Sequence, residues 1–200
     1  LTPTNFLNIA QVLRQVRLLK EWFRQCEGTQ NHLKDLFSYL EPQKTLEDKI
    51  HSIILTEDLI DDFASSELAD IRRKIKSKQA KAKESIERII RSSKYQKALQ
   101  ENIVTIRDGR FVVPVKAEYK SEIPGLVHDT SSSGATLFVE PLSVVEANNE
   151  IRVLEMREKA EIERILYELS ALCASYAESI NHNFDVFIIL NIYFAKANLA

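Results

Sequence analysis

A segment rich in β-branched residues, residues 103–141, interrupts a chain that otherwise has helical periodicity. It holds three of the four glycines and three of the five prolines. Asp108-Gly109 stands between two apolar runs and favours a type I′ hairpin turn, which needs positive φ at both central positions. A second strand pair is predicted at 126–129 and 135–140, joined by small polar residues. We therefore expect a small antiparallel β insertion between long helices.

Apolar residues recur at helical spacing before this insertion. The pattern predicts one helix over about 4–25, ended by Gly28, and a second over about 31–40. A third helix begins at Thr45 and places four apolar residues on its buried side: Leu46, Ile50, Ile53 and Ile54. Residues 1–64 are therefore predicted to form the first part of a helical core.

The remaining helices define the predicted fold. Residues 65–102 form a long outgoing helix whose sparse apolar stripe suits one partner helix. Residues 142–181 have the three-four spacing typical of a coiled coil and form the returning helix. Residues 182–200 are apolar nearly all round, which predicts a fully buried helix returning to the core. The predicted fold class is mainly α, grouped with the all-α proteins: a small helical core and a long antiparallel helix pair carrying the β insertion, residues 103–141, at its tip.

Charge is distributed unevenly over the 200 residues, although the formal net charge is only −2. Residues 68–120 hold 15 Lys and Arg against six Asp and Glu, so this quarter carries +9 and the remainder −11. Such asymmetry indicates a polyanionic partner for one part of the molecule. A solvated helix face is the alternative interpretation.

Other classes are disfavoured by composition. No apolar run approaches the roughly 18 residues of a membrane span, so we expect no membrane partner. Cys26 and Cys173 are far apart in helical patterns, which favours reduced thiols in a cytosolic protein. The histidines lack paired-ligand spacing, and we expect no metal site and no cofactor. Because the chain opens with Leu1, we expect it to be part of a longer protein.

Three strings resemble a known family. They are Ile106-Arg-Asp-Gly-Arg-Phe-Val-Val-Pro-Val-Lys116, Gly125-Leu-Val-His-Asp-Thr-Ser-Ser-Ser-Gly-Ala-Thr-Leu-Phe-Val-Glu-Pro141 and Asn148-Asn-Glu-Ile-Arg152. They are similar to the MutS family of DNA-handling ATPases, in the bacterial branch often called MutS-two. The resemblance implies a core and lever segment, with residues 103–141 where MutS proteins place a DNA-contacting clamp.

The resemblance also implies partners and a location. Members of this branch are similar in binding branched DNA, suppressing homologous recombination and forming homodimers, and some are linked to stalled ribosomes. A cytoplasmic location, at the nucleoid or the ribosome, is implied. No Gly-x-x-x-x-Gly-Lys-Ser/Thr loop occurs here and no nuclease-type domain matches, so we expect this segment to be non-catalytic.

The predicted nucleic-acid contacts are cations of the basic quarter. Such residues bind phosphates and position a protein without reading bases. Four lie in the insertion: Arg107, Arg110, Lys116 and Lys120. Of these, Arg107 and Arg110 flank the turn and are expected to project into solvent. The other four lie on the adjoining helix: Arg88, Arg91, Lys94 and Lys97.

Two further groups of residues have alternative interpretations. His128, Asp129 and Ser131–133 suggest a hydrolase triad, but neighbouring strand residues point to opposite faces, which favours turn hydrogen bonds instead. Residues 148–150 either hydrogen-bond to the insertion's loop or are simply exposed.

Two functions follow. The preferred hypothesis is a DNA-binding lever and clamp-like module that recognises branched DNA. The rival is a mechanical and dimerisation segment. A ribosomal or other RNA target stays open, because phosphate contacts do not distinguish the nucleic acids.

Overall fold

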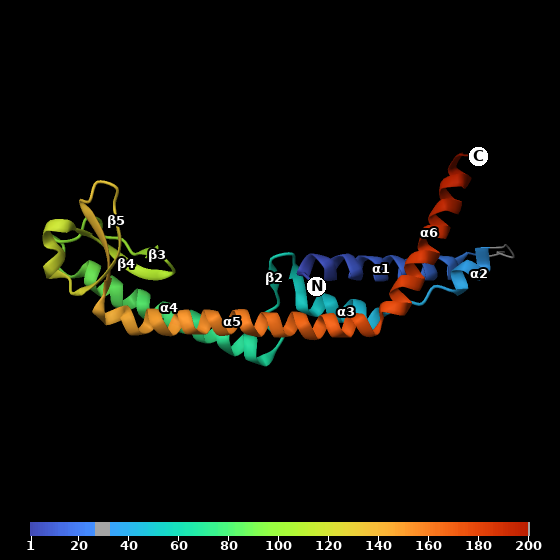
Figure 1. Cartoon of the computed structure of the whole chain (residues 1–200), viewed down its shortest axis with the longest axis horizontal. Coiled ribbons are helices and arrows are strands. Elements are labelled where there is room, and N and C mark those ends of the chain that lie inside the picture. The colour runs from blue at the N-terminus through green and yellow to red at the C-terminus, as the bar shows by residue number, and fades with distance from the viewer. Residues whose placement is uncertain (27–32, 200) are drawn as a thin grey trace. The chain divides into compact units, whose positions relative to one another are not determined.

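The computed structural model describes residues 1–26 and 33–199, which form two compact units (Figure 1). Unit 1 comprises Leu1–Ser66 and Ile162–Ala200, and unit 2 comprises Glu67–Glu161. Within residues 1–26 and 33–199, no helix has both the length and the apolar character that a bilayer span requires.

Unit 1 is built on helix α1 (Pro3–Gln25). Thr2 caps this helix: its hydroxyl accepts a hydrogen bond from the Asn5 backbone N–H, and the Asn5 side chain accepts one from the Thr2 backbone N–H. The buried residues of α1 recur every three or four positions, and α1 packs on α3 (Lys44–Ile53): Phe6, Ala10, Leu13 and Val16.

Helices α2 (Leu33–Ser38) and α6 (Ala177–Leu199) join the same unit. The Phe37 ring of α2 stacks on Phe23, with ring centres 4.1 Å apart. A cluster of five buried residues links α1, α2 and α6: Val16, Phe37, Leu40, Val186 and Leu190. The predicted helix end at Gly28 and the predicted helix start at 31–32 lie outside the described residues.

Helix α6 does not have the burial that its composition predicted. Its buried residues are Asn183, Val186 and Leu190. Six large apolar side chains of the same helix are between 37% and 50% exposed: Phe184, Ile188, Ile189, Ile192, Tyr193 and Phe194. The prediction of a fully buried closing helix is therefore wrong, because unit 1 covers only one face of α6.

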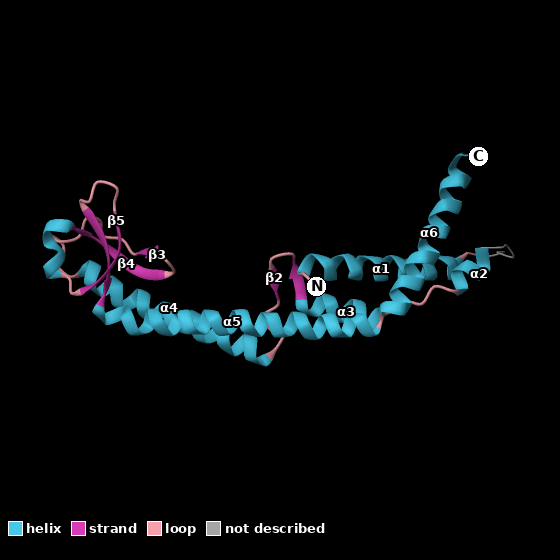
Figure 2. Ribbon diagram, viewed as in Figure 1, coloured by secondary structure: helices cyan, strands magenta, loops and turns pink. Residues whose placement is uncertain are grey.

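Unit 2 combines helices with a four-stranded antiparallel sheet (Figure 2). The helices are α4 (Ser66–Arg91), the first part of α5 (Leu142–Ser175) and the 3₁₀ helix η1 (Ala117–Glu122). The strands are β3 (Thr105–Arg107), β4 (Arg110–Lys116), β5 (Gly125–Thr130) and β6 (Thr136–Pro141), in the spatial order β3-β4-β6-β5. The two predicted hairpins therefore join through β4 and β6.

The helices of unit 2 run antiparallel. Arg72 of α4 forms a salt bridge with Glu158 of α5 at 2.7 Å, and Lys78 pairs with Glu150. Helix α4 ends at Arg91 rather than near residue 102. Ser92 and Ser93 follow it directly, and serine competes with helical hydrogen bonds through its hydroxyl.

The predicted β3–β4 turn is confirmed. Asp108 has a φ of 49° and Gly109 a φ of 73°, and Arg107 pairs with Arg110 across the turn. One face of the sheet then packs on α4 and α5 in a core that includes Ile86, Val113, Val115, Val139 and Val144.

The predicted all-α fold class is wrong. Unit 2 contains the four-stranded sheet, and unit 1 contains a two-stranded sheet of β1 (Ile54–Thr56) and β2 (Leu59–Ile60). Ile54 was predicted on the buried side of the third helix, but α3 ends at Ile53 and the chain turns back from Ile54 as a tight hairpin. The chain is mainly helical with two antiparallel sheets.

Candidate nucleic-acid interface

Unit 2 contains a buried carboxylate, Glu140, which is 0% exposed. Arg110 Nη1 donates to both of its oxygens, at 2.8 and 3.1 Å. Asn148 Nδ2 donates to Oε1 at 2.6 Å, and His128 Nε2 lies 2.5 Å from Oε2. Arg110 also donates to Asn149 Oδ1 at 2.7 Å. A buried charge is tolerated when it is paired and hydrogen-bonded, as here. These five residues are called the Glu140 network below.

The Asn148 side chain completes the hydrogen bonding of strand β4. Its Oδ1 accepts from the Phe111 N–H at 3.3 Å, and its Nδ2 donates to the Phe111 carbonyl at 3.2 Å. The β4–β6 pairing starts only at Val113 and Val139, so the amide satisfies backbone groups that β6 does not reach. Of the two alternatives for residues 148–150, hydrogen bonding to the insertion holds for Asn148 and Asn149, although the contacts are with strand residues and not with a loop. Glu150 instead pairs with Lys78 of α4.

A bulge in β5 directs His128 into the network. The pairing with β6 shifts between Val127 and Asp129, which leaves His128 as the extra residue. The His128 ring then meets Glu140, whereas Asp129 Oδ2 accepts from Arg107 Nε at 3.1 Å. The two neighbours therefore have different partners.

The loop after Asp129 uses its polar groups on its own backbone. Asp129 Oδ1 accepts from the Thr130 N–H at 2.8 Å, and Ser131 Oγ accepts from the Thr136 N–H at 3.0 Å. These contacts confirm the predicted turn hydrogen bonds and give no support to a triad. Among the residues that the structure describes, no group of three His, Cys, Asp or Glu is arranged to hold a metal ion.

Arg110 has a different place from the one predicted. The sequence placed it in solvent beside the hairpin turn, but its side chain is 15% exposed and lies against Glu140. Its charge is therefore balanced inside unit 2. A guanidinium in such a pair is poorly placed to bind a phosphate.

Arg107 is half-exposed and held by several contacts. Its Cζ lies 3.9 Å from the centre of the Phe138 ring. Besides the Asp129 contact, its Nη1 donates to Thr105 Oγ1 at 3.2 Å and to the Ile106 carbonyl at 2.9 Å. The guanidinium therefore has one fixed orientation.

The other six predicted cations lie mainly at the surface. Arg91, whose side chain is 79% exposed, forms an (i, i+4) pair with Glu87, an exposed contact of small energetic value. Lys116 Nζ donates to the Lys97 carbonyl at 3.2 Å, and the Lys116 N–H donates to the Ala98 carbonyl, so β4 lies beside the segment after α4. We call the six the outer cations: Arg88, Arg91, Lys94, Lys97, Lys116 and Lys120.

Comparison with known proteins identifies the family. No family model matches the chain. Over its full length the chain is 48% identical to the protein named Endonuclease MutS2 of Ruminiclostridium cellulolyticum. It is 48% and 46% identical to the proteins of the same name from Acetivibrio thermocellus and Clostridium acetobutylicum, again over its full length. The chain belongs to the MutS2 family. It spans about a quarter of the length of these bacterial relatives, 26%, 26% and 25%.

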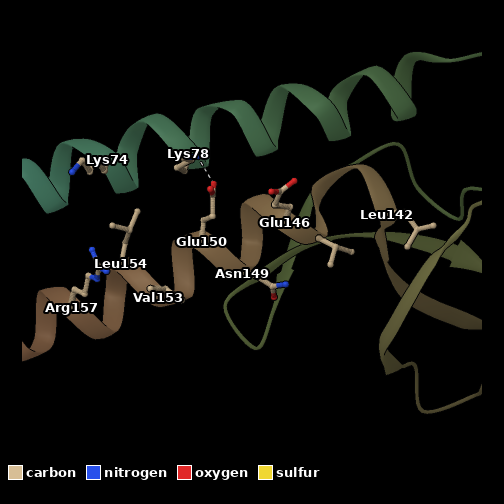
Figure 3. A pocket seen from close by; sticks show the side chains of 10 residues that line it. Lys74, Lys78, Leu142, Glu146, Asn149, Glu150, Val153, Leu154 and Arg157 are labelled. Atoms are coloured by element: carbon tan, nitrogen blue, oxygen red, sulfur yellow. Dashed lines mark ion pairs between the residues drawn. The ribbon is translucent and has the colours of Figure 1, made fainter.

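The MutS2-family chain also has a groove of about 750 Å³ along α4 and α5 within unit 2 (Figure 3). Apolar side chains of α5 line it: Leu142, Val145, Val153 and Leu154. The Lys78 and Glu150 charges at its rim are paired with each other, as the dashed line in Figure 3 marks. Lys74, Glu146 and Arg157 line it as well, so the groove combines an apolar surface on α5 with charges of both signs.

The pKa of Glu140 follows from its surroundings. Burial raises this pKa, because a carboxylate loses hydration in the interior. Hydrogen bonds from Asn148, His128 and Arg110 outweigh burial, so the pKa lies below its usual range. Glu140 is thus a stable anion at neutral pH, and its charge fixes the position of Arg110.

We predict that Glu140→Gln destabilises the MutS2-family chain at pH 7 by about 3 kcal/mol, because Arg110 loses its buried counter-charge. The folded pKa of Glu140 is lower than the unfolded value of about 4.3. The stabilisation is therefore complete above about pH 4.3 and is lost as pH falls through the folded pKa. Urea unfolding of both proteins between pH 3 and 7 measures the difference.

Glu146→Gln is the matched control, because Glu146 is an exposed glutamate of α5, six residues after Glu140. This variant should unfold like the wild type at every pH. A loss of unfolding free energy in Glu140→Gln that grows on acidification, or that is missing at pH 7, contradicts the role assigned to the Glu140 network.

Proposed function

We propose that unit 2 of this MutS2-family chain binds the phosphate backbone of branched DNA. The observation that carries the proposal is the set of outer cations, which are exposed or half-exposed and whose charges no buried carboxylate among residues 1–26 and 33–199 balances. They belong to the quarter of the chain that carries +9. Binding of this kind depends on the release of counterions from the nucleic acid and is independent of base sequence.

The shape of the DNA, and not its sequence, is then the property recognised. Lysine and arginine side chains at the end of α4, in the segment that follows it, at the end of β4 and in η1 contact phosphates from several directions, as a branch point presents them. In the whole protein such binding would serve the suppression of homologous recombination. A cytoplasmic location, at the nucleoid or the ribosome, belongs to the same proposal.

The proposed contribution of this segment is binding, not catalysis. The relatives are named endonucleases, but the chain spans about a quarter of their length. In the part of the chain that the structure describes, His128 and Asp129 are engaged with Glu140 and Arg107 and present no nucleophile. We assign nucleotide and nuclease chemistry of the whole protein to regions beyond the residues of unit 2.

We predict that replacing Arg88, Arg91, Lys94 and Lys97 together with alanine weakens binding to a DNA junction at least tenfold at low salt. Each phosphate contact that is lost should reduce the slope of log affinity against log salt by about 0.9. Fluorescence anisotropy of a labelled four-way junction at 50 to 200 mM salt measures both quantities.

An equal number of exposed cations in unit 1 provides the control: Arg14, Lys34, Lys44 and Lys49 replaced with alanine. This variant should keep the affinity and the salt slope of the wild type. Equal losses in the two variants would mean that binding follows total charge, which contradicts a site in unit 2. Competition by structured RNA against the junction decides between the two nucleic acids.

A second candidate function is a dimerisation and motion-transmitting segment. The exposed apolar residues of α6 favour it, because large contiguous apolar patches commonly mark interaction sites. In this proposal α6 of one copy contacts an apolar surface of another copy or of another part of the whole protein.

For this candidate we predict a dimer of the 200-residue chain at about 100 μM that Ile189→Glu converts to a monomer, since a buried unpaired charge is costly. Sedimentation velocity measures the state, with Asn181→Glu on an exposed position of α6 as the control. A wild-type chain that stays monomeric and still binds junctions rules against the dimer.

A further inference from the structure

The further inference concerns Arg107 and rests on the proposed function. We propose that the Arg107 guanidinium, seated on the Phe138 ring, is a platform on which one unpaired base of a branched nucleic acid stacks. The outer cations would hold the phosphates of the same strand. Arg107 would then contact a base and not, as the sequence suggested, a phosphate.

The first reason is the fixed orientation of the guanidinium. One face lies on the Phe138 ring at 3.9 Å, and its Nε and Nη1 edges are used by Asp129, Thr105 and the Ile106 carbonyl. The side chain is nevertheless 37% exposed. The parts of the guanidinium that these contacts do not use are its second face and the Nη2 group. A planar cation held in one orientation loses little entropy when a second planar group stacks on it.

The second reason is charge. Asp129 Oδ2 is 3.1 Å from Arg107 Nε and balances the positive charge locally. A phosphate placed on this pair would also meet the Asp129 carboxylate, which repels it. A neutral base has no such penalty, and bases stack on arginine planes and on aromatic rings in proteins that bind unpaired nucleotides.

The third reason is the surroundings of the platform. Phe138 pairs with Pro114 across β4 and β6, and Lys116 pairs with Thr136 two residues further along the same strands. Residues two apart on a strand share a face, at a spacing of about 7 Å. Lys116 is therefore on the face of the sheet that carries Phe138, at about the distance between a base and its own phosphate.

These features select an unpaired nucleotide. In a paired duplex both faces of each base are covered by neighbouring base pairs, so a base can reach a platform only where stacking is broken. The branch point of a junction offers such bases, which a continuous duplex lacks. The platform would thus add preference for a branch to phosphate contacts that do not distinguish sequences.

The test uses the 200-residue chain and two three-way junctions, one fully paired and one with two unpaired nucleotides at the branch. One unpaired position carries 2-aminopurine, whose fluorescence falls when it stacks. For the wild type we expect about fivefold to tenfold tighter binding to the junction with unpaired nucleotides, together with a fluorescence change. Arg107→Lys keeps the charge but removes the plane, so the affinity ratio should fall towards one and the fluorescence change should disappear. Phe138→Leu, which removes the ring beneath Arg107, should lower the ratio to an intermediate value.

Arg14→Lys is the matched control, because Arg14 is an exposed arginine of unit 1. It should keep both the ratio and the fluorescence signal. An affinity ratio near one for the wild type, or a ratio that Arg107→Lys leaves unchanged, overturns the platform while junction binding itself upholds the proposed function. If the chain binds neither junction at low salt, the proposed function and the platform fail together.

Discussion

The buried charge of Glu140 is the interaction on which unit 2 depends. A carboxylate that is 0% exposed is stable only if its partners are held around it, and these come from β4, β5 and α5: Arg110, His128 and Asn148. The same Asn148 amide satisfies the Phe111 backbone, which lies beyond the last β4–β6 pair. One carboxylate thereby fixes the sheet onto the start of α5 in a single register, which apolar packing alone specifies less strongly.

The basic residues of unit 2 differ in how their charges are balanced. The charge of Arg110 is neutralised by Glu140, and the charge of Arg107 is balanced by Asp129 while its guanidinium lies over the Phe138 ring. The outer cations have no buried counter-charge within the part of the chain that the structure describes, and their exposure lets a polyanion replace their counterions. The basic segment therefore has three physical roles. The buried Arg110 stabilises the fold of unit 2, the half-exposed Arg107 is proposed to contact a base, and the outer cations are proposed to contact phosphates.

The sequence predicts local features of unit 2 better than long-range ones. Asp108-Gly109 identifies its hairpin because the turn chemistry lies within the dipeptide. The position of Arg110 could not be predicted from neighbouring residues. Its partner Glu140 lies 30 residues further along the chain and comes close only because β4 pairs with β6. An acidic residue between Val139 and Pro141 in an otherwise apolar strand was the one available signal. In unit 1 the short β1–β2 hairpin was missed because Ile53 and Ile54 fit a helical stripe. The helix α6 was predicted, but its burial was not, because composition does not tell which apolar face is covered.

Hydrogen–deuterium exchange of the 200-residue chain, with and without a DNA junction at low salt, tests the central claim most directly. The account predicts slower exchange over residues 88–97, 105–107 and 116–120 in the presence of DNA, with unchanged exchange over α1 and α6 of unit 1. Exchange that slows only in unit 1, or that DNA leaves unchanged throughout unit 2, would contradict the assignment of nucleic-acid binding to unit 2.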